Sequence, residues 1–304
     1  MAEDYPRTLL DFERRFSTVE SCCEYVAALR WPEGFRCPKC SAPNGWRTNR
    51  GLWLCGKCRY QASATAGTIF QDSHLSLTLW FRAMWYVTNQ KNGASALGMQ
   101  RLLGLGSYKT AWALMHKLRR AMVRPSRDRL RGVVEVDEAY WGGEEEGVRG
   151  RKTEDKALIA VAAEEDGKGI GRVRLRRIPT ADRITLHAFI AEVAEPGSTI
   201  RTDGLNAYRE LKGYNHDRQV QRRQAEGEHL LPRVHRVISL LKRWLLGTHQ
   251  GAVEHDYLDY YLDEFTFRFN RRKSASRGKL FYRLVQQAVE IGPVPFKALT
   301  NHNP

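Results

Sequence analysis

The 304-residue sequence lacks the features that define membrane, secreted and repetitive proteins. It has no run of about eighteen apolar residues, so no membrane-spanning helix is expected. The first residues, MAEDYPRTLLDFERRF, contain no apolar core of a secretory signal. Internal repeats and low-complexity tracts are also absent. These absences predict a cytoplasmic protein that makes no membrane contact.

Acidic residues are few relative to basic ones. The chain has 34 Asp and Glu against 49 Lys and Arg, a formal net charge of +15. Such an excess of positive charge opposes compact folding unless a polyanion neutralises it. Nucleic acid is the expected partner. The alternative is a basic soluble enzyme without such a partner.

Cysteine is scarce, but four of the six cysteines form two Cys-x-x-Cys pairs. Cys37 and Cys40 are separated from Cys55 and Cys58 by fourteen residues. In a reducing compartment this spacing favours a tetrahedral zinc site over disulfides. All four ligand positions would be filled, so the zinc is expected to be structural. The remaining two, in VESCCEYVAAL, are expected to be buried thiols.

Basic and aromatic residues alternate around these pairs. Trp46, Arg47, Arg50, Trp53 and Arg59 all lie within or next to the cysteine module. Such a mixture suits contacts with a nucleic-acid backbone and its bases, and we expect Arg47 and Arg50 to bind DNA. The alternative is that the two tryptophans fill the small core of the module.

A helical region is expected to follow. Residues 1–65 are expected to form an N-terminal helix and the zinc ribbon, and residues 66–125 a helical domain. Gly104 and Gly106 divide this domain into two helices, and Ser107 is a favourable N-cap for the second. A short glycine turn between two helices predicts a helix-turn-helix. Its candidate DNA contacts are Lys109, Arg119 and Arg120.

The pattern changes to short strands after residue 131. Strands are expected at 132–137, 156–163, 171–178 and 198–203, with a helix at 181–194 between the last two. Helices then dominate from Leu230 to Val289. This order predicts a mixed α/β sheet in a domain spanning 131–292.

Two aspartates stand at the carboxyl ends of expected strands. Asp137 and Asp203 each follow a mainly hydrophobic or β-branched segment, where a carboxylate is costly unless it meets a cation. On neighbouring strands they could hold a hard divalent ion such as Mg²⁺. Glu135 shares the strand face of Asp137, whereas Glu138 points elsewhere. The alternative is that both aspartates cap turns or pair with arginines.

A third group comes from the segment VHRVISLLKRWLLGTHQG. Its apolar residues recur at helical spacing, and His235, Ser239 and Lys242 form an adjacent face. A neutral imidazole beside two carboxylates could complete a metal site. Lys242, two turns further on, could pair with a phosphate. The alternative is an ordinary surface histidine.

Four long motifs carry a family resemblance. VEVDEAYWGG, TDGLNAY, LPRVHRVISLLKRWLLGTHQG and YLDEFTFRFNRR resemble the catalytic domain of ISXO-type bacterial insertion-sequence transposases. The zinc ribbon and the helical segment after it resemble the same group. The resemblance covers roughly residues 8–290. It implies an RNase H-like fold and a DDE-type site.

The resemblance also assigns roles to individual residues. It makes Asp137 and Asp203 the first two metal-binding acids and gives the third role to His235, where many members have glutamate or asparagine. A histidine adds no negative charge, which weakens a second metal site; Glu226, Glu228 or Glu264 would be alternative third carboxylates. Lys242 matches the family lysine. The motif Asn270-Arg271-Arg272 is expected to contact DNA or pack helices, and Arg243 is a further candidate DNA contact.

The implied function is DNA transposition. Two Mg²⁺ or Mn²⁺ ions, about 3.5–4 Å apart, would support cleavage at the terminal inverted repeats of an element and transfer of the 3′-hydroxyl ends into target DNA. Joining two ends of double-stranded DNA predicts a homodimer or larger assembly, associated with the bacterial nucleoid. The alternatives are a non-catalytic zinc-ribbon DNA-binding regulator and an RNase H-like nuclease that does not join ends.

Overall fold

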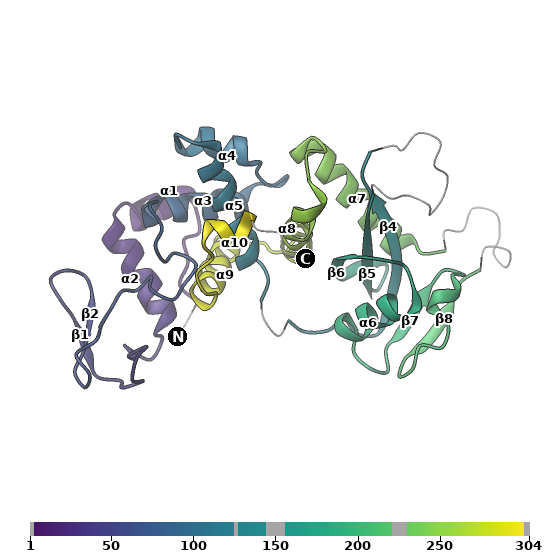
Figure 1. The fold of residues 1–304 in the computed structure, drawn as a ribbon, viewed down its shortest axis with the longest axis horizontal. Helices are drawn as coiled ribbons and strands as arrows, with labels where there is room; N and C mark the ends of the chain where they lie inside the picture. The colour runs from purple at the N-terminus through teal and green to yellow at the C-terminus, as the bar shows by residue number, and fades with distance from the viewer. Residues whose placement is uncertain (1–2, 125–126, 144–155, 221–229, 301–304) are drawn as a thin grey trace. The chain divides into compact units, whose positions relative to one another are not determined.

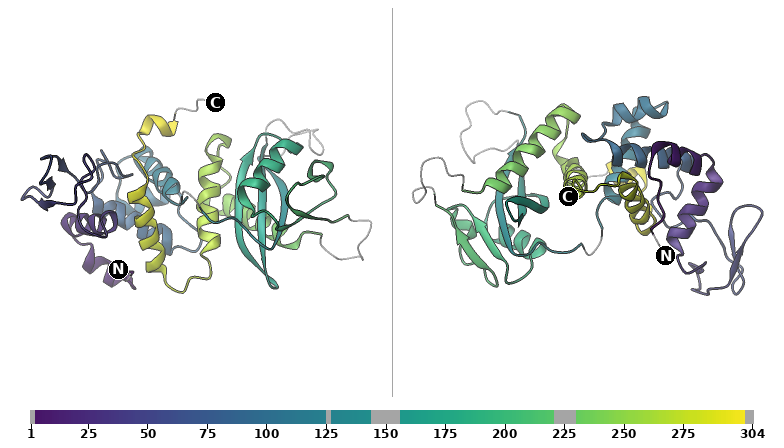
Figure 2. Two further views of the ribbon diagram at one scale, coloured as in Figure 1. Left: turned by 90° about the horizontal axis from the view of Figure 1, so that it is seen from below. Right: turned by 180° about the vertical axis from the view of Figure 1, so that it is seen from behind.

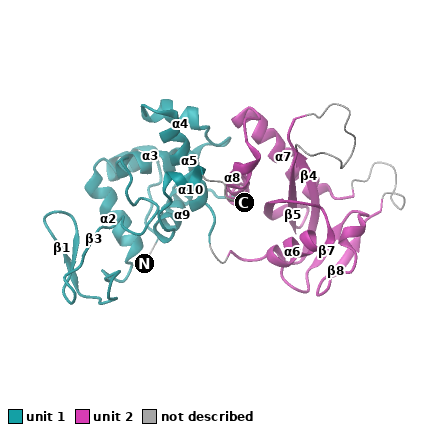
Figure 3. Ribbon diagram, viewed as in Figure 1, with its two compact units in different colours: residues 1–124, 273–304 teal, residues 125–272 magenta. Residues whose placement is uncertain are grey.

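The protein is described from a computed structural model, in which residues 3–124, 127–143, 156–220 and 230–300 are placed. Contacts divide the chain into two units (Figure 3). Unit 1 comprises residues 1–124 and 273–304, and unit 2 comprises residues 125–272. The chain therefore leaves unit 1 after Arg124 and returns to it at Lys273. The boundaries expected at residues 65 and 292 lie inside unit 1.

The cysteine module of unit 1 is a small antiparallel sheet. Strands β1 (Gly45–Arg47), β2 (Trp53–Cys55) and β3 (Gln61–Ala62) are paired in that order. The cysteine pairs lie on the turns that flank these strands, as in a zinc ribbon. The expected ribbon is therefore present, built from very short strands.

Helices form the rest of unit 1 (Figure 1). Serine or threonine hydroxyls cap α1, α2, α3, α4 and α9, each accepting a hydrogen bond from a backbone N–H of the first turn. Among the described helices, none is long and apolar enough to cross a membrane. The helices of unit 1 are α1 (Leu9–Arg15), α2 (Val19–Arg30), α3 (Leu77–Asn89), α4 (Ala96–Leu103), α5 (Tyr108–Ala121), α9 (Arg277–Glu290) and α10 (Phe296–Thr300).

The predicted helix-turn-helix corresponds to α4 and α5. Gly104 ends α4 with φ 62°, a left-handed conformation that glycine adopts without a steric penalty. Ser107 occupies the N-cap position of α5, as expected, but its side chain makes no capping hydrogen bond. The turn between the helices is thus set by the glycine rather than by the serine.

An aromatic core joins the N-terminal helices to α9. Phe281 lies 5.4 Å from both Phe12 and Phe81, measured between ring centroids, and Phe12 stacks on Trp85 at 4.8 Å. Gly278 permits this close packing, because a Cβ atom there would lie 1.7 Å from the carbonyl oxygen of Pro6. Helix α9, expected to belong to the α/β domain, thus packs in unit 1.

Unit 2 contains a mixed five-stranded sheet in the order β6-β5-β4-β7-β8. The first three strands are antiparallel neighbours, whereas β7 pairs in parallel with both β4 and β8. This arrangement confirms the RNase H-like fold. The strands are β4 (Val133–Trp141), β5 (Ala157–Asp166), β6 (Gly169–Ile178), β7 (Thr199–Thr202) and β8 (Asn215–Arg218).

Helices cover both faces of this sheet (Figure 2). On one face, α6 (Arg183–Val193) and the short helix η1 (Asn206–Tyr208) enclose a core that includes Val134, Val136 and Phe189. On the other, α7 (Pro232–His249) and α8 (Leu258–Asn270), the latter preceded by η3 (His255–Tyr257), pack on the opposite side chains of β5 and β6. Side chains of β4 alternate between the faces, so Glu135 and Asp137 point toward α7.

Candidate active site and zinc-binding module

The four cysteine sulfurs form a ligand set suited to zinc. Cys37 Sγ lies 3.6 Å from Cys58 Sγ, and Cys40 Sγ lies 3.6 Å from Cys55 Sγ. A tetrahedral site with Zn–S bonds of about 2.3 Å requires sulfur separations of about 3.8 Å. Backbone N–H groups, first that of Cys58, lower the pKa of the Cys55 thiol to about 6. The geometry and the set of four sulfur donors fit a structural Zn²⁺.

The two tryptophans of the module differ in environment. Trp53 packs 5.2 Å from Trp31 at the end of α2, which agrees with a structural role. Trp46 is 51% exposed, with the guanidinium of Arg59 5.8 Å from its ring centroid. Of the two readings of these aromatic residues, core filling therefore applies to Trp53, and Trp46 is left at the surface.

Strand β4 and helix α7 bring the first two candidate catalytic residues together. His235 Nε2 lies 3.1 Å from Asp137 Oδ2, within hydrogen-bonding distance. Asp137 is 16% exposed and His235 is 49% exposed, so the pair lies at the edge of the core and faces solvent. His235 thus contacts the first candidate acid from an exposed position on α7.

Asp203 follows strand β7, the parallel neighbour of β4. Glu135 of β4 lies directly opposite Arg201 of β7. Asp137 and Asp203 each follow their member of this pair by two residues, and the strands run in parallel, so the two aspartates occupy corresponding positions. Asp203 Oδ1 accepts a hydrogen bond from the Leu205 backbone at 2.9 Å, which shapes the following turn. Asp137 therefore lies within β4, which runs on to Trp141 instead of ending at the aspartate as expected, and Asp203 lies just past the end of the neighbouring strand β7.

The pKa of the Asp137 carboxyl is raised above its ordinary value by burial and in part by the nearby Asp203. Burial is the main reason that its pKa is raised, and the negative charge of Asp203 raises it further. Hydrogen bonding and charge from His235 act in the opposite direction. A bound cation would favour the charged form of the Asp137 carboxyl and so act against both of the effects that raise its pKa.

The three groups are less tightly clustered than the cysteines. Across the described ranges, the four cysteines are the single set of three or more potential ligand residues whose donor atoms all lie within 4.8 Å. Because Asp137 and His235 are in contact, Asp203 must lie further than this from at least one of them. Two of the three candidate ligands, Asp137 and His235, are therefore in contact, whereas Asp203 stands outside a cluster of that size.

The remaining candidates for the site lie in different places. Lys242 is exposed on α7, about two helical turns beyond His235. Glu264, an alternative third carboxylate, is fully buried in α8. The other two alternatives, Glu226 and Glu228, lie outside the described residues.

Two further acids near the site have roles that local sequence patterns did not reveal. Glu135 is fully buried and accepts hydrogen bonds from the first turn of α7. Glu138 points to the opposite face, as expected, and accepts a 2.6 Å hydrogen bond from the hydroxyl of the buried Tyr208. Tyr208 follows Asp203 by five residues, so this bond ties β4 to the segment after β7.

The candidate DNA-contacting residues fall into two groups. Arg47 forms an ion pair with Glu24 at 2.6 Å, and Arg119 is 1% exposed, so its guanidinium lies inside unit 1. The exposed candidates are Arg50, Lys109, Arg120 and Arg243.

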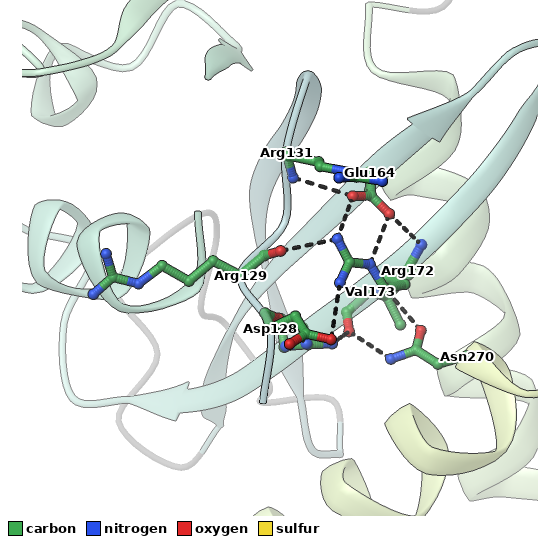
Figure 4. Close-up of polar contacts among 8 residues, drawn as sticks. Asp128, Arg129, Arg131, Glu164, Arg172, Val173 and Asn270 are labelled. Carbon is green, nitrogen blue, oxygen red and sulfur yellow. Dashed lines mark hydrogen bonds and ion pairs between the residues drawn. The ribbon is translucent and has the colours of Figure 1, made fainter. Parts of the chain in front are cut away.

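The motif Asn270-Arg271-Arg272 packs against strand β6. Asn270 Oδ1 accepts a hydrogen bond from Val173 N at 2.7 Å, and its Nδ2 donates to Val173 O at 3.1 Å (Figure 4). Arg272 donates to the carbonyl of Gly171, and the Arg271 guanidinium lies 4.0 Å from the ring centroid of Phe267. Asn270 and Arg272 thus bond backbone groups of β6, the strand at one end of the sheet order.

Comparison with known proteins agrees with these features. Residues 129–270 match the family described as ISXO2-like transposase domain, and residues 17–61 match the transposase zinc-ribbon domain. A relative from Halobacterium salinarum is 29% identical over 279 residues, which cover 84% of this chain and 92% of the relative. It is described as an uncharacterized protein in transposable element ISH50. Two segments of the chain are thus similar to the zinc-ribbon and ISXO2-like domains of transposases.

Proposed function

We propose that this chain is a DNA transposase that cleaves and rejoins DNA through Asp137, Asp203 and His235. The observation that carries the proposal is the contact between Asp137 and His235 at 3.1 Å, beside a second aspartate on the neighbouring parallel strand. The match of this region to the ISXO2-like transposase domain supports the same reaction class.

Each residue of the site would have a separate role in phosphodiester transfer. Asp137 and Asp203 would hold Mg²⁺ or Mn²⁺, with His235 as a neutral nitrogen ligand. When bound, these ions polarise the scissile phosphate and favour deprotonation of the attacking water or 3′-hydroxyl. Lys242 would neutralise phosphate charge next to the site. Because the attacking oxygen comes from water or DNA, the protein needs no serine or tyrosine nucleophile.

DNA recognition would come from unit 1. The zinc ribbon and the α4–α5 pair present exposed basic groups, among them Arg50, Lys109 and Arg120, and would bind the terminal inverted repeats of an element. Arg243 of α7 would contact DNA near the site. Two ends have to be joined to one target, so a homodimer or larger assembly is the proposed active form.

Asparagine substitutions test the site directly. We expect Asp137→Asn or Asp203→Asn to abolish Mg²⁺-dependent cleavage and strand transfer while binding to end DNA is kept, because the shape is preserved and the charge is lost. The matched control is Asp256→Asn, a 56% exposed aspartate in the same unit, which should leave all activities unchanged. Normal cleavage by either active-site variant would reject the assignment.

The same assays separate the alternative functions. DNA binding without Mg²⁺- or Mn²⁺-dependent cleavage by the unmodified protein would identify a non-catalytic regulator. Cleavage without transfer of pre-cleaved ends would identify a nuclease that does not join DNA.

A further inference from the structure

Helix α7, which carries His235, lacks a cap of its own. Its N-cap residue is Leu231, whose side chain cannot accept a hydrogen bond, and Pro232 follows. The carboxylate of Glu135 takes this role from strand β4, accepting hydrogen bonds from Arg233 N at 2.7 Å and Val234 N at 2.9 Å. The start of α7 is therefore fixed by a residue nearly one hundred positions earlier in the chain.

A chain of ion pairs extends from this cap across the sheet. The Arg233 guanidinium contacts Glu135 Oε1 and Glu165 Oε1, both at 3.0 Å. Glu165 also faces Arg201 at 3.5 Å, and Arg201 donates to Asp217 at 2.7 Å. These contacts join α7 to strands β4, β5, β7 and β8.

Three residues of the ion-pair chain each precede a candidate site residue by two positions in the sequence. Glu135 precedes Asp137 by two residues, and Arg201 precedes Asp203 by the same number. On a strand, residues two apart share a face and lie about 7 Å from each other. Arg233 and His235 are also two residues apart, in the first turn of α7, and they contact Glu135 and Asp137 respectively.

Burial makes a purely stabilising role a weak explanation for these charges. Glu135 is fully buried and the side chain of Arg233 is 16% exposed. Removing such a pair from water costs as much as its attraction returns, and apolar residues would pack a helix on a sheet equally well. Directional hydrogen bonds, in contrast, fix where α7 starts along β4, and this position determines whether His235 reaches Asp137.

We propose that Glu135 is a positioning residue of the candidate active site. Its carboxylate anchors the first turn of α7. With Arg233 and Glu165 it holds His235 against Asp137, next to the end of β7, which Asp203 follows. The catalytic part of this statement rests on the proposed function, whereas the anchoring of α7 does not.

Amide hydrogen exchange on the full-length protein tests the anchoring. In Glu135→Gln, exchange across residues 233–236 should become faster, on the order of tenfold, because a charged cap is replaced by an amide that meets the Arg233 donors poorly. The control is Glu164→Gln in the same sheet, whose carboxylate bonds Arg131 N and Arg172 instead. Unchanged exchange at 233–236 in Glu135→Gln, or an equal increase in the control, overturns the proposal.

Cleavage of end DNA as a function of Mn²⁺ concentration tests the catalytic part. Residues that orient metal ligands typically contribute 10- to 100-fold to metal affinity or activity. Glu135→Gln should therefore need about tenfold more Mn²⁺ for half-maximal cleavage and recover at high Mn²⁺. Loss of active protein by misfolding would lower the maximum and leave the half-saturating concentration unchanged, and this result would overturn the catalytic part.

The outcome can be separated from that of the proposed function. Full cleavage by Asp137→Asn would reject the site, but faster exchange at 233–236 would still establish the cap. If Glu135→Gln does not fold, Glu165→Gln serves in its place, because Glu165 is 30% exposed and contacts the same arginine. It should shift both readouts in the same direction by a smaller factor, and no shift relative to Glu164→Gln would refute the proposal.

Discussion

Replacement of Asn270 by alanine should destabilise unit 2 without weakening DNA binding. The Asn270 side chain makes two hydrogen bonds, at 2.7 and 3.1 Å, to the backbone N–H and C=O of Val173. Val173 is fully buried and lies on β6, which has β5 as its sole strand neighbour. In the alanine variant the Val173 N–H loses its partner, whereas the Val173 carbonyl keeps a 2.9 Å hydrogen bond from the Arg174 guanidinium (Figure 4).

The magnitude follows from the one backbone group that is left without a partner. An unsatisfied buried backbone N–H costs about 1–3 kcal/mol. For a unit of this size, each kcal/mol lowers the melting temperature by about 2–4 °C. We therefore expect the unfolding transition of unit 2 to fall by roughly 2–12 °C.

Calorimetry of the full-length protein, combined with amide exchange, measures the effect. Exchange should increase locally across β6, which distinguishes loss of edge pairing from a general destabilisation. The matched control is Asn215→Ala on the opposite edge strand, where the side chain is exposed and makes a single 3.3 Å bond to Gly197 O; its effect should stay within about 0.5 kcal/mol. Unchanged stability of Asn270→Ala together with weaker, salt-sensitive binding to end DNA would refute the reasoning and make Asn270 a DNA contact.

Two further predictions concern the zinc module and the response to acid. Cys55→Ser, or removal of metal with a chelator, should make residues 36–62 susceptible to proteolysis while the unfolding of unit 2 stays unchanged, because four thiolates and one ion hold a module with very short strands; a protease-resistant module without zinc would contradict this. Burial raises the pKa of Glu164, but hydrogen bonds from Arg172 outweigh it and hold the pKa below its ordinary value of 4.5. The unfolded state therefore binds the proton more tightly, the stabilisation is present above pH 4.5 and is lost as the pH falls through the lower folded pKa. Acid titrations should show a shallower loss of stability in Glu164→Gln than in the unmodified protein, and equal slopes would contradict the assignment.

Periodicity in the sequence was sufficient to predict most of unit 2. The segments before Asp137 and Asp203 are mainly apolar or β-branched, so each acid is conspicuous in that context, although β4 continues past Asp137 to Trp141. Strand β8 was missed because its four residues, NHDR, contain no apolar side chain. It forms because β7 offers a ladder of backbone partners from Thr199 to Thr202.

The contacts that complete the site depend on tertiary structure. Nothing near Glu135 in the sequence identifies it as the cap of a helix that starts almost one hundred residues later. The sequence offers one indirect indication of this role: the residue before Pro232 is Leu231, which cannot cap a helix, so the cap has to come from elsewhere in the chain. Asn270 is similar: its two bonds to Val173 join positions 97 residues apart, and an asparagine at the end of a helix is locally indistinguishable from an ordinary terminal residue.

The electrostatics of α7 connect its folding to the assembly of the site. The first turn of this helix contains no acidic residue, although Arg233 lies there. Positive side chains at the positive end of a helix dipole are unfavourable, so the isolated segment would start poorly at this point. Strand β4 supplies the missing negative charge, because Glu135 accepts from the backbone N–H groups of this turn. Asp137, two residues further along the same strand, contacts His235. The contacts that allow α7 to begin at Pro232 thus lie next to the contact between His235 and Asp137, and both form when this helix docks on β4.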